Sequence, residues 1–431
     1  MPPENKNILA VNGGSSSIKF SLYESGRGQL PVKWLSGKID RIGLPGSKLT
    51  YTNSRNNNAV TEPVSADRKS GNAVTSEQKT VGGEVAVDAK TPREAAAFLL
   101  DWLEKQGARP LAGVGHRVVH GLQHRQAAFI DDQLLEELKK IRGYDPDHLP
   151  GEIDLIELFR SKDPDTPQLA CFDTAFHATL PRLAKLLPLP RRYDEAGLQR
   201  YGFHGLSYAY IMEELTRIDI TVARGSVVLA HLGSGASLAA VKDGVSIDTT
   251  MGFTPTGGIV MGTRTGDLDP GAIWYLLQNE RLTPAQFSRL VNHESGLLGV
   301  SATSSDMQDL LARESSDERA AEAVGLFCYQ IKKSIGAFSA VLGGLDALVF
   351  TGGIGERSAV IRSRICSGLD YLGISLDPGA NGSKEANGSS GANESSAVSI
   401  GAKESRTAVY AIPTDEEWMI ARTVNQLLEQ Q

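Results

Sequence analysis

Residues 8–23 read ILAVNGGSSSIKFSLY, and their pattern gives the first indication of the fold. Apolar residues lead into a turn of Asn, Gly and Ser, and an alternating apolar and polar run leads out of it. This pattern predicts a β-hairpin. The side chains at its tip are small enough for backbone N–H groups to approach an anion, and Ser15, Ser17 and Lys19 add donors. The tip is therefore a candidate phosphate-binding turn, although Asn-Gly is also the commonest signal of an ordinary hairpin turn.

A second hairpin with the same composition is predicted over residues 226–241, which read SVVLAHLGSGASLAAV. His231 stands where the first hairpin has Asn12. The repetition predicts that the chain contains one fold twice. Two such hairpins that face each other across a cleft could hold the phosphate chain of a nucleotide. The candidate ligands at the second tip are His231, Gly233, Ser234 and Gly235.

Three further runs, together with residues 12–20, resemble the acetate kinase family, which belongs to the sugar kinase, heat-shock ATPase and actin superfamily. These runs are RYGFHG at 200–205, MGFTP at 251–255 and MGTRTGD at 261–267. The resemblance extends from Ile8 to about Arg422. It implies an α/β protein of two duplicated actin-like ATPase domains with a cleft between them. The expected domains are residues 1–172, joined by the C-terminal helix 417–431, and a nucleotide-binding domain of residues 173–416.

The resemblance also implies a reaction, the reversible, Mg²⁺-dependent transfer of a phosphoryl group from ATP to a short-chain carboxylate. Acetate is the first expectation for the acceptor, and propionate and butyrate are the alternatives. A carboxylate is already ionised near neutral pH, so the acceptor needs no general base. We therefore expect Asp173 to position the metal ion and the substrates. The implied transfer residues are Arg117, Asp173, His204 and Arg264. The implied wall around the alkyl end of the acceptor consists of Val119, Phe203 and Pro255.

The remaining implied contacts concern ATP or ADP and the metal ion. Besides the two hairpin tips, the nucleotide contacts are Ser305, Asp306, Gln308, Gly352, Gly353 and Gly355. The implied Mg²⁺ ligands are Asn12 and Glu416, with Asp173 nearby. The chain departs from the family pattern at Asp147, Leu149, Leu206, Tyr208, Ser234, Gln308 and Asp415.

Composition limits the partners. The 431 residues are too many for one compact core, and an apolar content of 41% can fill two. A net charge of -7 with both signs mixed disfavours nucleic acid or an anionic membrane as partner. No run resembles a membrane span or a signal peptide, so we expect a cytoplasmic protein. We expect Cys171, Cys328 and Cys366 to be buried and unpaired. The family resemblance implies a homodimer.

Local patterns add further expectations. Residues 92–106 predict a helix that is capped by Thr91, and residues 113–121 predict a strand. On a helix, His116, His120 and His124 would share one face and suggest a metal site, but the glycines and valines between them disfavour a helix there. We expect surface loops over 53–80 and 379–406, and a glycine turn after the strand 347–350.

Two other functions remain open from the sequence. A sugar kinase of the same superfamily would need a base beside the acceptor and a polar cleft, whereas the expected wall is apolar. A nucleotide-sensing protein without transfer activity is compatible with the substitutions at Asp147, Ser234 and Gln308. The presence of both arginines and His204 argues against it.

Overall fold

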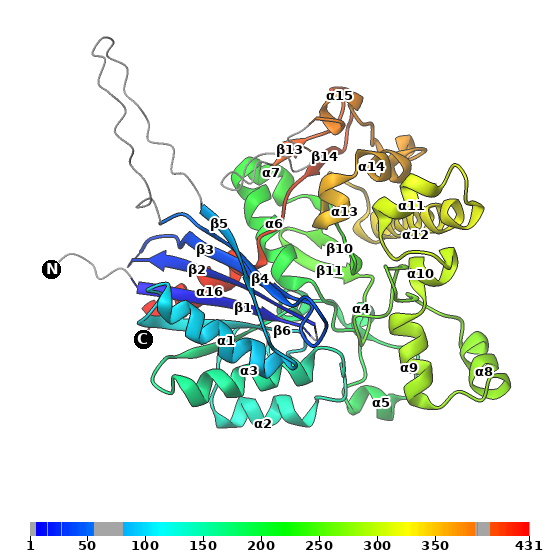
Figure 1. The fold of residues 1–431 in the computed structure, drawn as a ribbon. Helices are drawn as coiled ribbons and strands as arrows, with labels where there is room; N and C mark the ends of the chain where they lie inside the picture. The colour runs from blue at the N-terminus through cyan, green and yellow to red at the C-terminus, as the bar shows by residue number, and fades with distance from the viewer. Residues whose placement is uncertain are drawn as a thin grey trace, which may run out of the picture. The chain divides into compact units, whose positions relative to one another are not determined.

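The computed structural model describes residues 6–14, 16–26, 28–55, 81–383, 386 and 397–430. The chain forms two compact units (Figure 1). Unit 1 contains Met1–Gly121, Gln126–Phe172 and Glu416–Gln431, and unit 2 contains Leu122–Arg125 and Asp173–Asp415. Within the described residues, none of the helices combines the length and the apolar character that crossing a bilayer requires.

Unit 1 is built on an eight-stranded sheet with the order β5-β4-β3-β2-β1-β6-β8-β7. The predicted first hairpin is confirmed, because β1 and β2 pair antiparallel with Gly13 opposite Ile18. Strands β1, β6 and β8 run parallel to one another. The strands are β1 (Lys6–Gly13), β2 (Ser17–Ser25), β3 (Val32–Asp40), β4 (Lys48–Asn53), β5 (Val81–Ala86), β6 (Leu111–Val118), β7 (Ala128–Phe129) and β8 (Gln168–Phe172). The helices are α1 (Pro92–Lys105), α2 (Asp132–Lys140), α3 (Leu149–Lys162) and α16 (Glu416–Glu429).

The two faces of β6 contact different helices. A Cβ atom built on Gly115 would lie 2.3 Å from Cγ2 of Ile420, so α16 packs directly on this face. The His116 ring lies 5.3 Å from the ring of Phe159 on α3, which covers the other face. Because successive side chains of a strand alternate between faces, Arg117 shares the face of Gly115 and α16. Helix α1 packs against α3 (Figure 1).

Unit 2 is built on a six-stranded sheet with the order β11-β10-β9-β12-β14-β13. The second predicted hairpin is confirmed by the antiparallel pairing of β9 with β10. The strands are β9 (Ser226–Leu232), β10 (Ala236–Lys242), β11 (Val245–Thr249), β12 (Ala347–Thr351), β13 (Val398–Ser399) and β14 (Ala408–Ala411). The helices are η1 (Ala175–His177), α4 (Arg182–Lys185), α5 (Arg191–Glu195), α6 (Gly205–Ile218), α7 (Ile220–Ala223), α8 (Pro270–Asn279), α9 (Pro284–His293), α10 (Gly296–Ser301), α11 (Met307–Arg313), α12 (Glu318–Leu342), α13 (Gly352–Arg357), α14 (Ala359–Cys366), η2 (Asp370–Leu372) and α15 (Pro378–Asn381).

The two sheets share one topology, which confirms the predicted duplication. In unit 1 the run β3-β2-β1-β6-β8 consists of three antiparallel strands followed by two that are parallel to β1. In unit 2 the run β11-β10-β9-β12-β14 repeats this order and these directions. Each unit therefore contains the same five-stranded α/β motif.

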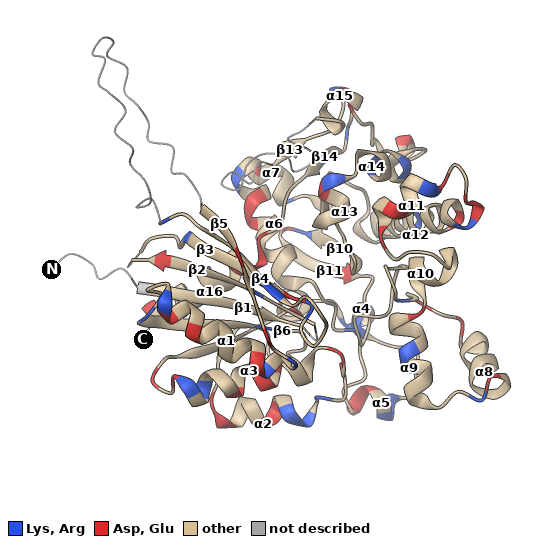
Figure 2. Cartoon of the chain, in the orientation of Figure 1, with Lys and Arg blue, Asp and Glu red and all other residues tan. Residues whose placement is uncertain are grey.

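Several local predictions can be compared with the structure. Helix α1 begins as expected, because the Thr91 hydroxyl accepts a hydrogen bond from the Glu94 N–H. The three cysteines are buried and free, as predicted. Charged side chains of both signs are spread over the helices of each unit (Figure 2).

Two local predictions were wrong. The glycine turn expected after residues 347–350 is the start of α13 itself, because Gly352 adopts a φ of 75° and turns the chain directly from strand into helix. The segment expected as a loop over 379–406 contains regular structure, since α15 includes residues 379–381 and β13 pairs with β14. Most of the other predicted loop, residues 56–80, lies outside the described residues.

Candidate active site

In unit 1, three of the predicted residues meet at one edge of the sheet. The Nη1 atom of Arg117 donates a hydrogen bond to Oδ1 of Asn12 at 3.3 Å, and its Nε lies 3.9 Å from Oε2 of Glu416. Asn12 is near the carboxyl end of β1, and Arg117 is near that of the parallel neighbour β6. Glu416 is the first residue of α16, where the helix dipole favours a carboxylate. The carboxyl ends of two parallel strands and a helix N-terminus thus build this cluster.

The donor atoms of this cluster suit Mg²⁺. Asn12 and Glu416 present an amide oxygen and a carboxylate, and Mg²⁺ is commonly bound through one or two carboxylates, substrate phosphates and water. Within the described residues, no group of three or more His, Cys, Asp or Glu side chains could hold a metal ion. An ion at Asn12 and Glu416 would complete its coordination with water or with oxygens of a bound nucleotide.

Val119 is the residue of the predicted acceptor wall that belongs to unit 1, and the buried side chain of Glu152 holds its backbone. Val119 is 2% exposed, and its N–H donates to Oε2 of Glu152 at 3.0 Å. Asp145, also buried, holds the ring of His148, whose Nδ1 lies 2.9 Å from Oδ1 of Asp145. No local pattern in the sequence points to Asp145 or Glu152, because only tertiary packing brings these acids to their partners.

The first hairpin tip is described in part. The Gly14 N–H donates to the carbonyl of Ser17 at 2.8 Å, which closes the turn, and Lys19 is exposed on β2. Ser15 lies outside the described residues.

In unit 2, three loops that carry predicted nucleotide contacts and the loop that carries Arg264 come together at the second hairpin tip. The tip is closed by a hydrogen bond from the Gly233 N–H to the carbonyl of Gly235 at 3.0 Å. The Ser234 carbonyl accepts from the N–H of Gly262 at 3.0 Å. A Cβ atom on Gly262 would lie 3.4 Å from the carbonyl oxygen of Ser305, and one on Gly233 would lie 3.9 Å from the backbone nitrogen of Gly353. Small residues thus allow these loops to approach one another closely.

The other predicted nucleotide contacts differ in exposure. Ser305, Asp306 and Gln308 are exposed at the start of α11, where Asp306 caps the helix. Gly353 is also exposed, whereas Gly352 and Gly355 are buried.

Glu356 holds the start of α13 in place. Its Oε1 accepts from the N–H groups of Gly352 at 2.9 Å and Thr414 at 3.0 Å. Burial raises the pKa of Glu356, and the backbone donors oppose this rise. Arg362, which is fully buried, donates to the carbonyls of Gly355 and Glu356 at 2.8 Å each. The glycine segment that the sequence singled out is therefore fixed by a carboxylate at its start and by a guanidinium at its end.

The predicted transfer residues His204 and Arg264 converge on the second hairpin tip. A Cβ atom on Gly235 would lie 3.3 Å from Nε2 of His204 and 3.6 Å from Nη1 of Arg264. Arg264 Nη1 also donates to the carbonyl of Pro255 at 3.1 Å, so one guanidinium contacts both the tip and the predicted acceptor wall. Phe203, the other wall residue of this unit, is 1% exposed.

The orientation of His204 is fixed by its neighbours. The residue has a φ of 60°, in the left-handed region that non-glycine residues seldom adopt. Its Nδ1 lies 2.9 Å from Oγ of Ser237, which also contacts the Tyr208 hydroxyl at 2.5 Å. Its ring stacks on that of His231 with centroids 4.2 Å apart, and Nδ1 of His231 lies 2.8 Å from Oγ of Ser207. These contacts leave Nε2 of His204 directed toward Gly235 and Arg264.

The protonated phenol of Tyr208 allows one direction for this chain of hydrogen bonds, in which each hydroxyl donates to the next group. Burial raises the pKa of Tyr208, so the phenol keeps its proton and can donate it to Ser237. The hydroxyl of Ser237 is then free to donate to Nδ1 of His204. Ser237 was not among the predicted site residues, although its place opposite His231 follows from the hairpin register.

Asp173 and His177 follow β8. Asp173 is fully buried, and its carbonyl accepts from the N–H of Gly205 at 2.9 Å. A Cβ atom on Gly205 would lie 2.0 Å from that oxygen, so only glycine fits there. His177 is packed rather than placed for chemistry, because its ring nitrogens lie 2.8 Å from Oγ of Ser246 and 3.1 Å from the carbonyl of Phe203. Burial lowers the pKa of His177 to about 4, so its ring is neutral near pH 7.

The duplicated sheet and the glycine-rich hairpin tips define an α/β protein of the actin-like ATPase and sugar kinase class. The profile of the acetokinase family matches residues 7–422. An acetate kinase of Rhodopseudomonas palustris is 42% identical, with 98% of each chain aligned. A propionate kinase of Citrobacter rodentium is 41% identical over 97% of this chain and 96% of that one. The solved structure of a propionate kinase from Francisella tularensis covers 97% of this chain and 98% of its own, with a TM-score of 0.81 and 32% identity.

The chain therefore belongs to the acetokinase family. Membership of this family supports a carboxylate kinase activity.

Proposed function

We propose that the protein transfers the terminal phosphoryl group of ATP to acetate and forms ADP and acetyl phosphate. The observation that carries this proposal is the convergence of His204 Nε2 and Arg264 Nη1 on Gly235. A phosphoryl group bound at this tip would meet an imidazole and a guanidinium at once. Both groups suit the charge on the equatorial oxygens of a phosphoryl in transfer.

The proposed step needs no proton transfer. A carboxylate oxygen of acetate attacks the terminal phosphorus, and the bond from that phosphorus to the bridging oxygen of ADP breaks in line. Arg264 holds the migrating phosphoryl, and Arg117 holds the acceptor carboxylate. Asp173 orients the reacting groups. Mg²⁺, when bound through Asn12 and Glu416, neutralises charge on the nucleotide phosphates.

Trapping the acyl phosphate with hydroxylamine tests this proposal. The protein is incubated with ATP, Mg²⁺ and acetate, propionate or butyrate, and the hydroxamate is measured. We expect product with acetate and a loss of 10²-fold or more, in order of magnitude, for Arg264→Gln. Arg289→Gln is the control, because Arg289 is exposed on α9 and pairs with Glu294. ATP turnover with a sugar would favour a sugar kinase, and ATP binding without hydroxamate would favour a sensor; either would refute the proposal.

Propionate is the second candidate, because the 41% identical relative from Citrobacter rodentium is a propionate kinase. One methylene in an apolar pocket is worth only about 1–3 kcal/mol, so the two acids can differ as little as tenfold in kcat/KM. Measuring kcat/KM for both acids decides between them. We expect acetate to have the higher value, and a higher value for propionate would correct the proposed acceptor.

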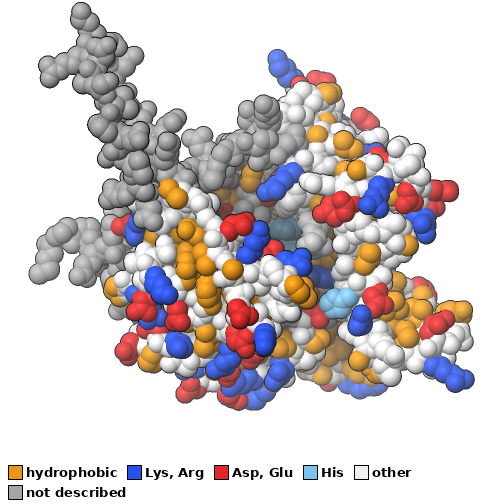
Figure 3. Space-filling model, viewed as in Figure 1, with side chains coloured by type: hydrophobic (Ala, Val, Ile, Leu, Met, Phe, Trp, Pro, Cys, Tyr) orange, Lys and Arg blue, Asp and Glu red, His pale blue; other side chains and the backbone are white. Residues whose placement is uncertain are grey.

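We also propose that the protein acts as a homodimer, with α8 in the contact between the copies. This helix has the sequence PGAIWYLLQN, yet none of its residues is buried in the chain. Trp274 and Tyr275 are 66% and 60% exposed, and hydrophobic side chains gather over α8 in Figure 3. A large exposed apolar patch commonly marks a protein interface. The mass in solution should be that of a dimer, and Trp274→Glu should shift it toward the monomer, whereas Leu183→Glu, at an exposed leucine on α4, should not.

A further inference from the structure

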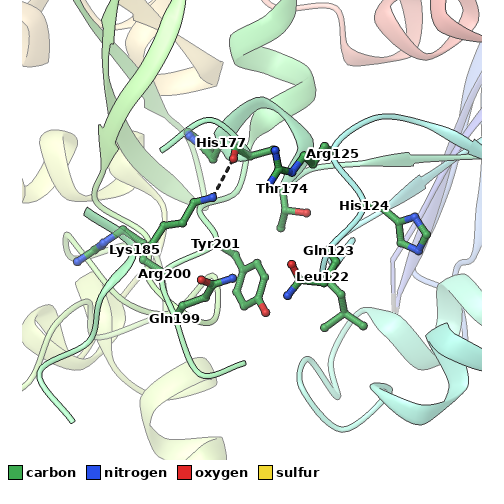
Figure 4. Close-up of a pocket in the computed structure, with 11 residues that line it drawn as sticks. Leu122, Gln123, His124, Arg125, Thr174, His177, Lys185, Gln199, Arg200 and Tyr201 are labelled. Atoms are coloured by element: carbon green, nitrogen blue, oxygen red, sulfur yellow. Dashed lines mark hydrogen bonds between the residues drawn. The ribbon is translucent and has the colours of Figure 1, made fainter. Parts of the chain in front are cut away.

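Unit 2 contains a small pocket that the proposed transfer reaction does not use. Its cavity has a volume of about 40 Å³ and lies between residues 122–125, the segment after Asp173, and residues 199–201 (Figure 4). One ordered water needs about 10–15 Å³, so the cavity has room for a few waters or for one small polyatomic ion.

The described residues that line this pocket are rich in cations and include no Asp or Glu. Arg125, Lys185 and Arg200 all line it. In Figure 4 the side chains of Arg125 and Lys185 point toward the same part of the pocket. Nζ of Lys185 donates to the carbonyl of Ala178 at 2.8 Å. Arg200 points away and donates to backbone carbonyls, including that of Thr249 at 2.9 Å. Arg200 therefore adds positive potential, whereas Arg125 and Lys185 supply the donors.

The two donor groups repel each other. Burial lowers the pKa of Lys185, and the positive charges of Arg125 and Arg182 lower it further. An anion between Arg125 and Lys185 would replace this repulsion with two charge-assisted hydrogen bonds.

Neutral polar groups complete the lining. The hydroxyl of Thr174 and the amides of Gln123 and Gln199 lie around the same space in Figure 4. Amide and hydroxyl groups can donate to the oxygens that two cations leave unsatisfied. Such a lining favours a small ion with several acceptor oxygens over an apolar molecule.

We propose that this pocket binds a divalent tetrahedral oxyanion of the phosphate class, separately from the transfer residues. Two cations and three neutral donors match the charge and the oxygen count of such an ion. The site adjoins the transfer residues through short connections, since Thr174 follows Asp173 and His177 contacts the carbonyl of Phe203. The inference does not depend on which carboxylate the protein phosphorylates.

Inorganic phosphate is the probe for the test. Unfolding of the full chain is measured with and without phosphate, at constant ionic strength and with a saturating non-hydrolysable ATP analogue that fills the nucleotide phosphate positions. At ten times its dissociation constant, phosphate should shift the folding equilibrium by about elevenfold. Arg125→Gln and Lys185→Gln should each reduce this shift to less than about twofold. Lys333→Gln, which removes one exposed charge on α12, should keep the full shift.

The outcomes separate clearly. Sulfate should reproduce the effect of phosphate. Acetate, the proposed acceptor, should produce only a shift that Arg125→Gln and Lys185→Gln leave unchanged, because it binds at the transfer residues. A phosphate shift that is unchanged in both pocket variants, or no shift in the unaltered protein, would overturn the proposal. An acetate shift that disappears in the pocket variants would overturn the assignment of a divalent ion. Lys185→Gln removes a hydrogen bond to a backbone carbonyl, whereas Arg125 is exposed. Arg125→Gln should therefore fold and keep the test valid even if Lys185→Gln does not fold. A failure of acyl phosphate formation would leave this result unchanged, because the pocket variants alter neither hairpin tip.

Discussion

Removing the hydroxyl of Ser237 should show how the chain prepares His204 for transfer. Ser237→Ala deletes the oxygen that lies 2.9 Å from Nδ1 of His204 and that contacts the fully buried Tyr208. Loss of a hydrogen-bond partner for a buried group costs about 1–3 kcal/mol, and we expect the free energy of unfolding to fall by this amount. The ring of His204 keeps its stacking contact with His231 but loses the bond that fixes its tautomer.

The kinetic effect follows from the same geometry. If Ser237 donates to Nδ1, the neutral ring of His204 carries its proton on Nε2, the atom that faces Gly235 and Arg264. A neutral hydrogen bond is worth about 0.5–1.5 kcal/mol net, so misdirecting this donor should lower kcat by up to about tenfold, with KM for the carboxylate nearly unchanged. Tyr208→Phe keeps the contact between Ser237 and His204. When both effects are expressed in kcal/mol, its effect on kcat should therefore be smaller than its effect on the free energy of unfolding.

The assay compares three variants by hydroxamate formation and by denaturant unfolding. Ser207→Ala is the matched control, because Ser207 contacts His231 rather than His204. Nitrogen NMR shifts of His204 should show a proton on Nε2 in the unaltered protein and a mixture in Ser237→Ala. If Ser237→Ala lost stability but kept the full kcat and the same tautomer, Ser237 would be only a structural residue and the reasoning would fail.

Three further predictions concern stability and are checked by denaturant unfolding. Gly205→Ala should destabilise the protein by more than about 3 kcal/mol, because the new Cβ would lie 2.0 Å from the Asp173 carbonyl; an unchanged midpoint would contradict this close approach. Arg362→Met should cost about 3 kcal/mol or more, since it leaves the buried carbonyl and side chain of Asn381 without their donor, and a cost below 1 kcal/mol would contradict it. Because burial lowers the pKa of His177 to about 4, the unfolded chain binds more protons than the folded one between about pH 4 and 6.5, so stability falls as the pH falls through that range. This residue should account for about 2 kcal/mol between pH 7 and pH 5, and His177→Gln should show a smaller decrease; equal slopes would refute it.

The elements that were predicted correctly are those that a short stretch of the sequence specifies by itself. Both hairpins follow from apolar alternation around a turn of small residues, and their repetition predicted the duplicated sheet. The start of α1 follows from the Thr91 cap. The glycine turn at Gly352 was misjudged because a positive φ can begin a helix as well as a loop.

The site was harder to predict where contacts join distant segments. The roles of Ser237 and Glu152 depend on which strand or helix packs opposite them, and no local pattern reports that. The pairing of Arg117 with Glu416 joins residues far apart in the chain, and the family resemblance alone suggested that both belong to one reaction. The structure supplies the physical reason for this pairing. Side chains of β6 alternate between the two faces of the sheet, and α16 packs on the face that carries Arg117.

The position of α16 in the chain has a consequence for synthesis. This helix covers the glycine face of β6, yet it is translated after all of unit 2. A ribosome therefore releases every strand of the first sheet, and then a whole second unit, before the segment that shields Gly115 emerges. During that interval the face of β6 that carries Gly115 lacks the helix that covers it in the folded chain, so this sheet completes its packing only after synthesis ends.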